Sequence, residues 1–74
     1  MIEYNGKKYN NRHGGPFDRG TADSWYSRGE NPHYFVGGTY MSTKVEKANM
    51  TEQDIADYMA GYEYNEKFGS KKEY

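Results

Sequence analysis

The sequence predicts a small, α-rich α+β domain with two helices, about residues 17–28 and 52–67, and one or two short β-hairpins, residues 2–9 and 34–41. Three observations predict this fold class: an N-cap signature before residue 52, a stretch that opens on Pro16 and closes on Gly29, and two Gly-containing dipeptides flanked by aromatic or β-branched residues. The 74 residues suffice for a single domain, residues 1–74.

The first nine residues are typical of a hairpin. Asn5-Gly6 is the dipeptide that tolerates positive φ at both centres of a type I′ turn. The resulting register places Tyr4 opposite Lys7, Glu3 opposite Lys8 and Ile2 opposite Tyr9. Because an isolated two-stranded ribbon is marginal in water, residues 1–13, which comprise this hairpin and a loop, must dock on the rest of the chain or fray.

The first helix is expected over residues 17–28. Pro16 has the fixed φ that suits the first helical turn, and Gly29 is placed to end the helix in the left-handed conformation. Gly20 costs about 1 kcal/mol relative to Ala within a helix, so it either weakens the helix or marks the close approach of another backbone.

The second hairpin is expected over residues 34–41, with Gly37-Gly38 as its two-residue turn. The aromatic and β-branched content of this segment supports strands, and the register would pair Tyr34 with Met41. The following segment, residues 42–49, has Val45 as its one aliphatic anchor and is interpreted as a linker or a short edge strand.

The second helix, residues 52–67, has the clearest start signal. Thr51 is the expected N-cap, with Asp54 in the capping-box position and Met50 and Ile55 placed as a hydrophobic staple. Gly69 is the expected stop, and the charged residues 70–74 are interpreted as a mobile tail.

Two faces of this helix are candidates for packing. Residues 55, 59, 62 and 66 recur at helical spacing, with Tyr58 beside them, and predict the buried stripe. Ala56, Ala60 and Gly61 form a strip of small residues that would let a neighbouring backbone or ring approach closely. We expect Trp25 to be that neighbour.

Composition excludes several classes of protein. The absence of cysteine excludes disulfides and thiol chemistry, and a net charge of -1 argues against a polycationic nucleic-acid binder. The sequence has no apolar run long enough to span a membrane and no signal-peptide pattern, which favours a cytoplasmic location. The apolar class makes 34% of the chain, with nine Tyr and no Leu, so aromatic residues supply most of the ordering material.

The side chains that could carry chemistry lie between Arg12 and His33. The two histidines, His13 and His33, have no metal-ligand spacing, and no phosphate-binding or nucleophile motif occurs. We therefore expect no enzyme activity, no metal and no cofactor. Asp23 follows Arg19 by four residues, which predicts an ion pair within the helix.

The abundance of tyrosine predicts an interaction surface as well as a core, because Tyr, Trp and Arg are enriched at binding hot spots. The expected contact residues are Trp25, Tyr26, Arg28, His33 and Tyr34, held in place by Arg19 and Asp23. A protein partner is the first expectation. RNA or the ribosome, through a local basic face, and a homodimer are the alternatives, and no membrane partner is expected.

Three segments resemble a family of small proteins found mostly in phages and some bacteria. They are GGPFDRGTADSWYSRGENPHY, the following GGTY, and MTEQDIADYMAGYEYNEKFG, and together they span about residues 14 to 69. The resemblance implies a phage-encoded accessory or regulatory protein that acts in the host cytoplasm. It implies no activity, because proteins of this family are uncharacterised.

A looser likeness is to ribosome modulation factor, a small two-helix protein. The likeness rests on Arg19-Gly20-Thr21-Ala22, Arg28, Pro32-His33-Tyr34 and Gly61-Tyr62, which occur in the same order. That factor is strongly basic, as ribosomal RNA binding requires, whereas this chain is not. The likeness therefore supports a two-helix plan and keeps a ribosome- or RNA-associated regulator as the alternative function.

The N-cap supplies a test of the second helix. Replacing Thr51 by Ala should lower the free energy of unfolding by about 1 kcal/mol, because a backbone N–H of the first turn loses its acceptor. Urea denaturation of the two proteins measures the difference, and a negligible change would mean that the helix begins at another residue.

Overall fold

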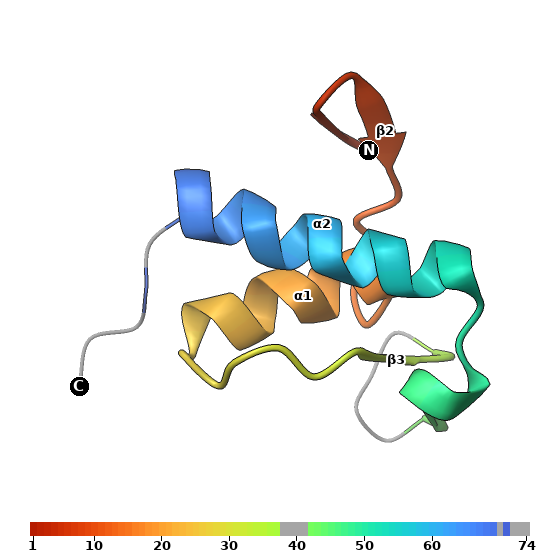
Figure 1. Ribbon diagram of the computed structural model, residues 1–74. Helices are drawn as coiled ribbons and strands as arrows, with labels where there is room; N and C mark the ends of the chain where they lie inside the picture. Colours follow the sequence, from red (N-terminus) through yellow and green to blue (C-terminus); the bar gives the residue numbers. More distant parts are fainter. Residues whose placement is uncertain (38–41, 70, 72–74) are drawn as a thin grey trace.

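The computed structural model describes residues 1–37, 42–69 and 71, and Figure 1 shows the order of its elements. These are β1 (Ile2–Tyr4), β2 (Lys7–Tyr9), α1 (Pro16–Trp25), β3 (His33–Phe35), β4 (Lys44–Glu46), the short 3₁₀ helix η1 (Lys47–Asn49) and α2 (Glu52–Phe68). The α-rich α+β fold class is confirmed: the described residues form two α-helices and two antiparallel strand pairs.

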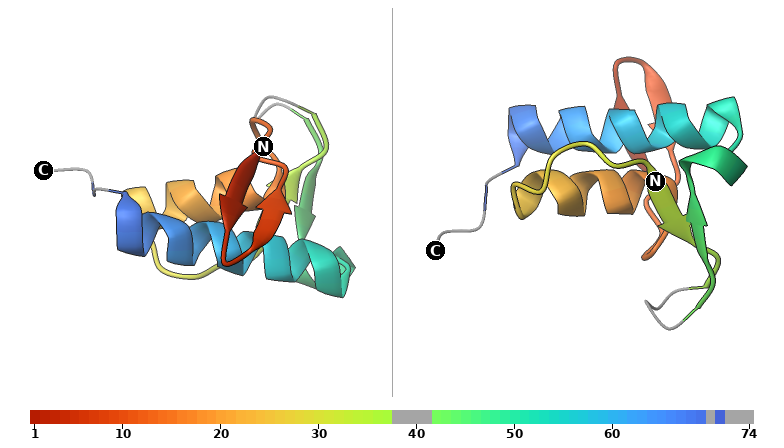
Figure 2. Two further views of the ribbon diagram at one scale, coloured as in Figure 1. Left: turned by 90° about the horizontal axis from the view of Figure 1, so that it is seen from above. Right: turned by 60° about the horizontal axis from the view of Figure 1, so that its bottom comes forward.

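The two helices lie side by side, run in the same direction and meet at two glycines (Figures 1 and 2). A Cβ atom on Gly20 would lie 2.1 Å from the carbonyl oxygen of Tyr58, and one on Gly61 would lie 2.1 Å from that of Phe17. Gly20 therefore marks the approach of another backbone, which was one of the two interpretations left open.

The expectation that Trp25 packs against the small residues of α2 is wrong. The backbone at Phe17 occupies the space beside Gly61, and Trp25 is 38% exposed. Two helix backbones in contact leave no room for an indole ring between them.

The buried face of α2 is also rotated from the expected one. Tyr58, Ala60 and Gly61 are buried, whereas Ile55 and Met59 of the predicted stripe are half-buried. The glycine contact sets this rotation, since Gly61 must face α1 for the backbones to meet.

Helix α1 ends three residues earlier than expected because Ser27, with φ 56°, is the left-handed residue that ends it; Gly29 also has positive φ but lies beyond the helix end. The Ser27 N–H donates to the Ser24 carbonyl at 3.0 Å, and the Arg28 N–H donates to the Asp23 carbonyl at 2.9 Å. This pair of bonds is a Schellman motif, which turns the chain back over the helix end.

Helix α2 begins as the sequence predicted. The Asp54 N–H donates to the Thr51 hydroxyl at 3.0 Å, and the Thr51 N–H donates to the Asp54 carboxylate at 3.1 Å, which completes the capping box. The helix ends at Phe68, one residue past the expected end, with Gly69 as the C-cap.

The hairpin of β1 and β2 has the predicted register, and Asn5 and Gly6 both have positive φ. It docks on the helices through aromatic rings. Tyr9 stacks on Phe17 with ring centroids 5.2 Å apart, and Tyr4 meets Tyr64 edge-on at 5.7 Å. The buried members of this core are Tyr4, Phe17 and Ala60.

The second strand pair is present, but its second strand lies further along the chain than expected. Tyr34 pairs with Val45, and Phe35 pairs with Lys44, so the partner strand comes from the segment interpreted as a linker or edge strand. The proposed partner Met41 and the turn residue Gly38 lie outside the described residues. The N–H of Val36 donates to the Thr43 carbonyl at 3.0 Å and continues this pairing.

The two strand pairs lie on opposite sides of the helix pair, with β1 and β2 above α2 and with β3 and β4 below it in Figure 1. The Phe35 N–H donates to the Gly14 carbonyl at 2.7 Å, which ties β3 to the loop that leads into α1. One side of the helix pair is therefore packed by aromatic rings, and the other faces β3.

The glycine contact generates a prediction. Gly20→Ala and Gly61→Ala should each destabilise the protein by about 1–3 kcal/mol, because the new methyl group would overlap a backbone atom of the other helix. Alanine would otherwise stabilise a helix by about 1 kcal/mol relative to glycine. Urea denaturation gives the values, and a gain in stability from either change would contradict the contact.

Ala56→Gly is the matched control, because Ala56 is exposed on α2. It should cost about 1 kcal/mol through helix propensity alone.

Candidate functional site

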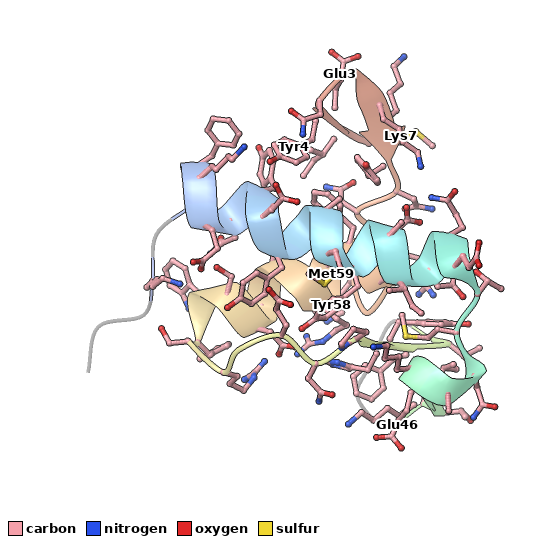
Figure 3. The ribbon with its side chains drawn as sticks, viewed as in Figure 1. Glu3, Tyr4, Lys7, Glu46, Tyr58 and Met59 are labelled. Carbon is pink, nitrogen blue, oxygen red and sulfur yellow. The ribbon has the colours of Figure 1, made fainter. Side chains whose placement is uncertain are left out.

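The side of the helix pair that faces β3 is built from polar side chains withdrawn from solvent. Arg19, Asp23 and His33 are each 6% exposed or less, and Tyr58 is fully buried. Arg19 and Asp23 share a face of α1 through their four-residue spacing. Figure 3 shows Tyr58 on the side of α2 that faces α1, whereas Tyr4 lies on the hairpin side.

The Asp23 carboxylate is the centre of this network. Arg28 donates to Oδ1 from Nε at 2.9 Å, its Nη2 lies 2.9 Å from the same oxygen, and the Tyr58 hydroxyl donates to Oδ2. The predicted ion pair between Arg19 and Asp23 is therefore wrong. The turn at Ser27 brings Arg28 back over Asp23, so that Arg28 is the arginine that binds this carboxylate.

Tyr58 links three segments through one hydroxyl group. It donates to Asp23 of α1 and accepts from the backbone N–H of Asn31 at 2.9 Å. Burial, reinforced by the hydrogen bond to Asp23, raises the pKa of Tyr58 well above the ordinary value of tyrosine. The hydroxyl therefore stays protonated and donates to Asp23, while its oxygen accepts from Asn31 and so holds the loop before β3 against both helices.

His33 has both ring nitrogens engaged. Its Nε2 accepts from Arg19 Nε at 3.3 Å, and its Nδ1 lies 2.6 Å from the Asn31 carbonyl oxygen. Because an arginine Nε–H can only donate, these bonds assign the proton of the imidazole to Nδ1. His33 thereby connects Arg19 to the loop that Tyr58 holds.

A cleft of about 610 Å³ opens beside this network. Its described walls come from α1, the loop after it, β3 and β4: Arg19, Asp23, Arg28, Asn31, His33, Phe35 and Lys44. The Arg19 guanidinium lies 5.8 Å from the centre of the Phe35 ring, so an apolar surface and a cation lie together in the wall.

The structure separates the predicted contact residues into two groups. Trp25 and Tyr26 are 38% and 37% exposed at the end of α1, and the Arg28 guanidinium lies 4.7 Å from the centre of the Tyr26 ring. His33 is 6% exposed and Tyr34 is half-buried, so both belong to the interior or its edge.

Sequence reasoning missed four residues of this site: Asn31, Phe35, Lys44 and Tyr58. Tyr58 was expected only beside the buried stripe, and Lys44 was placed in a linker or short edge strand with no role in a site. No sequence signal distinguishes Tyr58 from the other eight tyrosines, because its role depends on how α2 is rotated against α1.

A second polar cluster ties the ends of the two helices together. The fully buried Ser24 donates to the Glu66 carboxylate and accepts from Asn65 Nδ2 at 2.9 Å. Lys71 also bonds Glu66, and this bond and that of Ser24 hold the pKa of Glu66 below its usual range. Ser24 is inaccessible and its hydroxyl proton is engaged, so this cluster is structural.

The arrangement suits binding through fixed donors. No group of three or more metal-ligating side chains occurs among residues 1–37, 42–69 and 71. The network holds Arg28 both at a cleft wall and at an aromatic surface, where its half-exposed guanidinium can offer N–H donors to a partner.

The Tyr58 hydroxyl supplies a test of the network. Tyr58→Phe should lower the free energy of unfolding by about 1–3 kcal/mol, because it leaves the buried Asp23 Oδ2 and the partly buried Asn31 N–H without this partner. Tyr62→Phe, one turn further along α2, removes a hydroxyl that makes none of these hydrogen bonds and should change stability by no more than about 0.5 kcal/mol. Equal effects of the two changes would contradict the assignment.

The same variant tests the raised pKa of Tyr58. Unfolded tyrosine loses its proton near pH 10, whereas folded Tyr58 keeps it to higher pH. Its contribution to stability is therefore complete below about pH 10 and is lost as pH rises beyond that value. The urea midpoint of each protein is measured at about pH 8 and about pH 10.5. The drop in midpoint between these two pH values should be smaller for Tyr58→Phe than for the wild type.

Comparison with family models, with curated proteins and with solved structures gave no significant match. Neither described helix is long and apolar enough to cross a membrane. What the protein can bind is therefore inferred from the geometry of this site.

Proposed function

We propose that the protein is a small, non-enzymatic binding module that docks on a partner protein through the aromatic/Arg surface, which we define as Trp25, Tyr26 and Arg28. In line with the family resemblance, we propose a phage-encoded accessory protein that regulates a host or phage macromolecule in the host cytoplasm. Asp23 supports this surface because its carboxylate binds Arg28, and His33, which accepts from Arg19, lies 3.7 Å from that carboxylate.

The observation that carries the proposal is the exposure of two large aromatic side chains beside an arginine that is already held in place. Trp25 and Tyr26 are more than a third exposed in a chain that has few apolar residues to spare. Trp, Tyr and Arg are the residue types that dominate binding energy at protein interfaces.

Preorganisation supports the same function. Arg28 is bound by the Asp23 carboxylate and stacks on Tyr26, so its side chain has little freedom left to lose when a partner binds. Immobilising a flexible side chain on binding costs about 0.5–1.5 kcal/mol, and the network at Asp23 removes part of that cost for Arg28.

The alternative is a ribosome- or RNA-associated regulator, in which exposed aromatic rings would stack on bases. The net charge of -1 argues against it, because affinity for nucleic acid comes largely from the neutralisation of phosphates by Lys and Arg. The same experiment can distinguish the two functions.

The experiment is affinity capture with tagged protein from the cells in which it is naturally made, followed by measurement of the affinity for the purified partner. Trp25→Ala should lower the affinity for the partner at least about tenfold, as expected for a tryptophan hot spot. Phe68→Ala, which removes an exposed aromatic ring outside the aromatic/Arg surface, should leave the affinity within about twofold.

Two results would overturn the proposal. Equal binding by Trp25→Ala and wild type would remove the aromatic/Arg surface as the docking site. The second is that the captured partner is lost after ribonuclease treatment, and is held strongly at about 50 mM salt but not at about 200 mM. This result would favour the RNA-associated regulator.

A further inference from the structure

The cleft beside the aromatic/Arg surface has a chemistry of its own. Among the described residues, three cationic side chains line it, from Arg19, Arg28 and Lys44, against one carboxylate, that of Asp23. That carboxylate is covered by Arg28 and Tyr58. A chain with a net charge of -1 therefore concentrates positive charge in one concave place.

Donor groups remain for a ligand in this cleft. Arg28 uses Nε and Nη2 on Asp23, which leaves its Nη1 side outside that pairing, and its side chain is 47% exposed. Lys44 is 44% exposed, and the carboxylate of Glu46 lies 3.9 Å from its Nζ. Because Glu46 is itself 72% exposed, this surface pair is weak and can be exchanged for a better one.

The remaining wall is suited to a short apolar stem. Phe35 lines the cleft, and the centre of its ring lies 5.8 Å from the Arg19 guanidinium. A carboxylate carried on one or two methylene groups could meet the cations at its end and the ring along its stem. Asp and Glu side chains have this form.

A long polyanion fits the surroundings less well. Glu46 projects outward from β4 at the edge of the molecule in Figure 3, and Glu30 is exposed in the loop after α1. A nucleic-acid backbone that continued past the cleft would meet these carboxylates, whereas a single acidic side chain would not.

We propose that the cleft receives an Asp or Glu side chain from an acidic segment of the partner protein, next to the contact made by the aromatic/Arg surface. This inference rests on the proposed function and adds the chemistry of the partner. Binding of the carboxylate exchanges the surface pair of Lys44 for a less exposed one and uses the unpaired side of Arg28.

The test is an NMR titration of the full chain with a blocked pentapeptide that has glutamate at its second and fourth positions and glycine elsewhere. Its glutamine counterpart is the uncharged control. We expect saturable shifts of the amides of Asn31, His33, Phe35 and Lys44 with a dissociation constant on the order of 1 mM, the range of a single small contact. The glutamine peptide should give none.

Substitutions at two lysine positions then locate the contact. Lys44→Gln should raise the dissociation constant of the acidic peptide about threefold, which corresponds to the loss of one partly exposed ion pair. Lys44→Glu should raise it further. Lys47→Gln is the matched control, since Lys47 is exposed in η1, carries the same charge and does not line the cleft. Both positions are exposed enough for the fold to be retained.

Three results would overturn the inference: equal binding of the glutamine peptide, equal weakening by Lys44→Gln and Lys47→Gln, or tighter binding of a ten-residue oligothymidylate at the same amides. A partner that still depends on Trp25 while the acidic peptide fails to bind would remove this inference and leave the proposed function standing.

Discussion

The contact between the backbones of α1 and α2 constrains the rest of the molecule. Gly20 and Gly61 bring the helices so close that no side chain fits between them at that point. The side chains of both helices must therefore project to one side or the other of the contact. The aromatic core under β1 and β2 forms on one side, and the polar network beside β3 forms on the other.

The polar network shows how a chain without leucine stabilises the side of the helix pair that faces β3. Asp23, Tyr58 and His33 replace apolar packing with hydrogen bonds that join α1, α2 and the loop before β3. Buried polar groups are costly unless they are paired, and every buried side-chain nitrogen or oxygen of the described residues has a partner. The network is directional, so it fixes positions as well as supplying stability.

That directionality connects the interior to the surface. Asp23 is buried, yet it determines where the half-exposed Arg28 lies, and Arg28 in turn stacks on Tyr26. The aromatic/Arg surface and the cleft share Arg28, so a partner that engages both would contact one continuous face. Its geometry depends on the Schellman turn at Ser27 as much as on the side chains themselves.

Much of the fold could be predicted from the sequence, but less of the site. The Asn5-Gly6 turn with its register and the capping box of Thr51 and Asp54 are as predicted, because each depends on backbone angles and bonds within a few residues. The partner of Asp23 and the partner strand of β3 were not predicted. For Asp23, Arg19 was a plausible local partner, but Arg28 binds it. For β3, residues 39–41 were a plausible local partner strand, but residues 44–46 pair with it.

What the sequence by itself determined is therefore the set of elements: one domain, a hairpin at residues 2–9, and two helices whose starts are marked by Pro16 and Thr51. Only the tertiary structure decided that Trp25 stays at the surface while Tyr58 is buried. The reason is geometric, since the two glycines let the helices meet at their backbones and this contact sets the rotation of each helix. A single aromatic residue carries no local signal of which face of its helix will be buried.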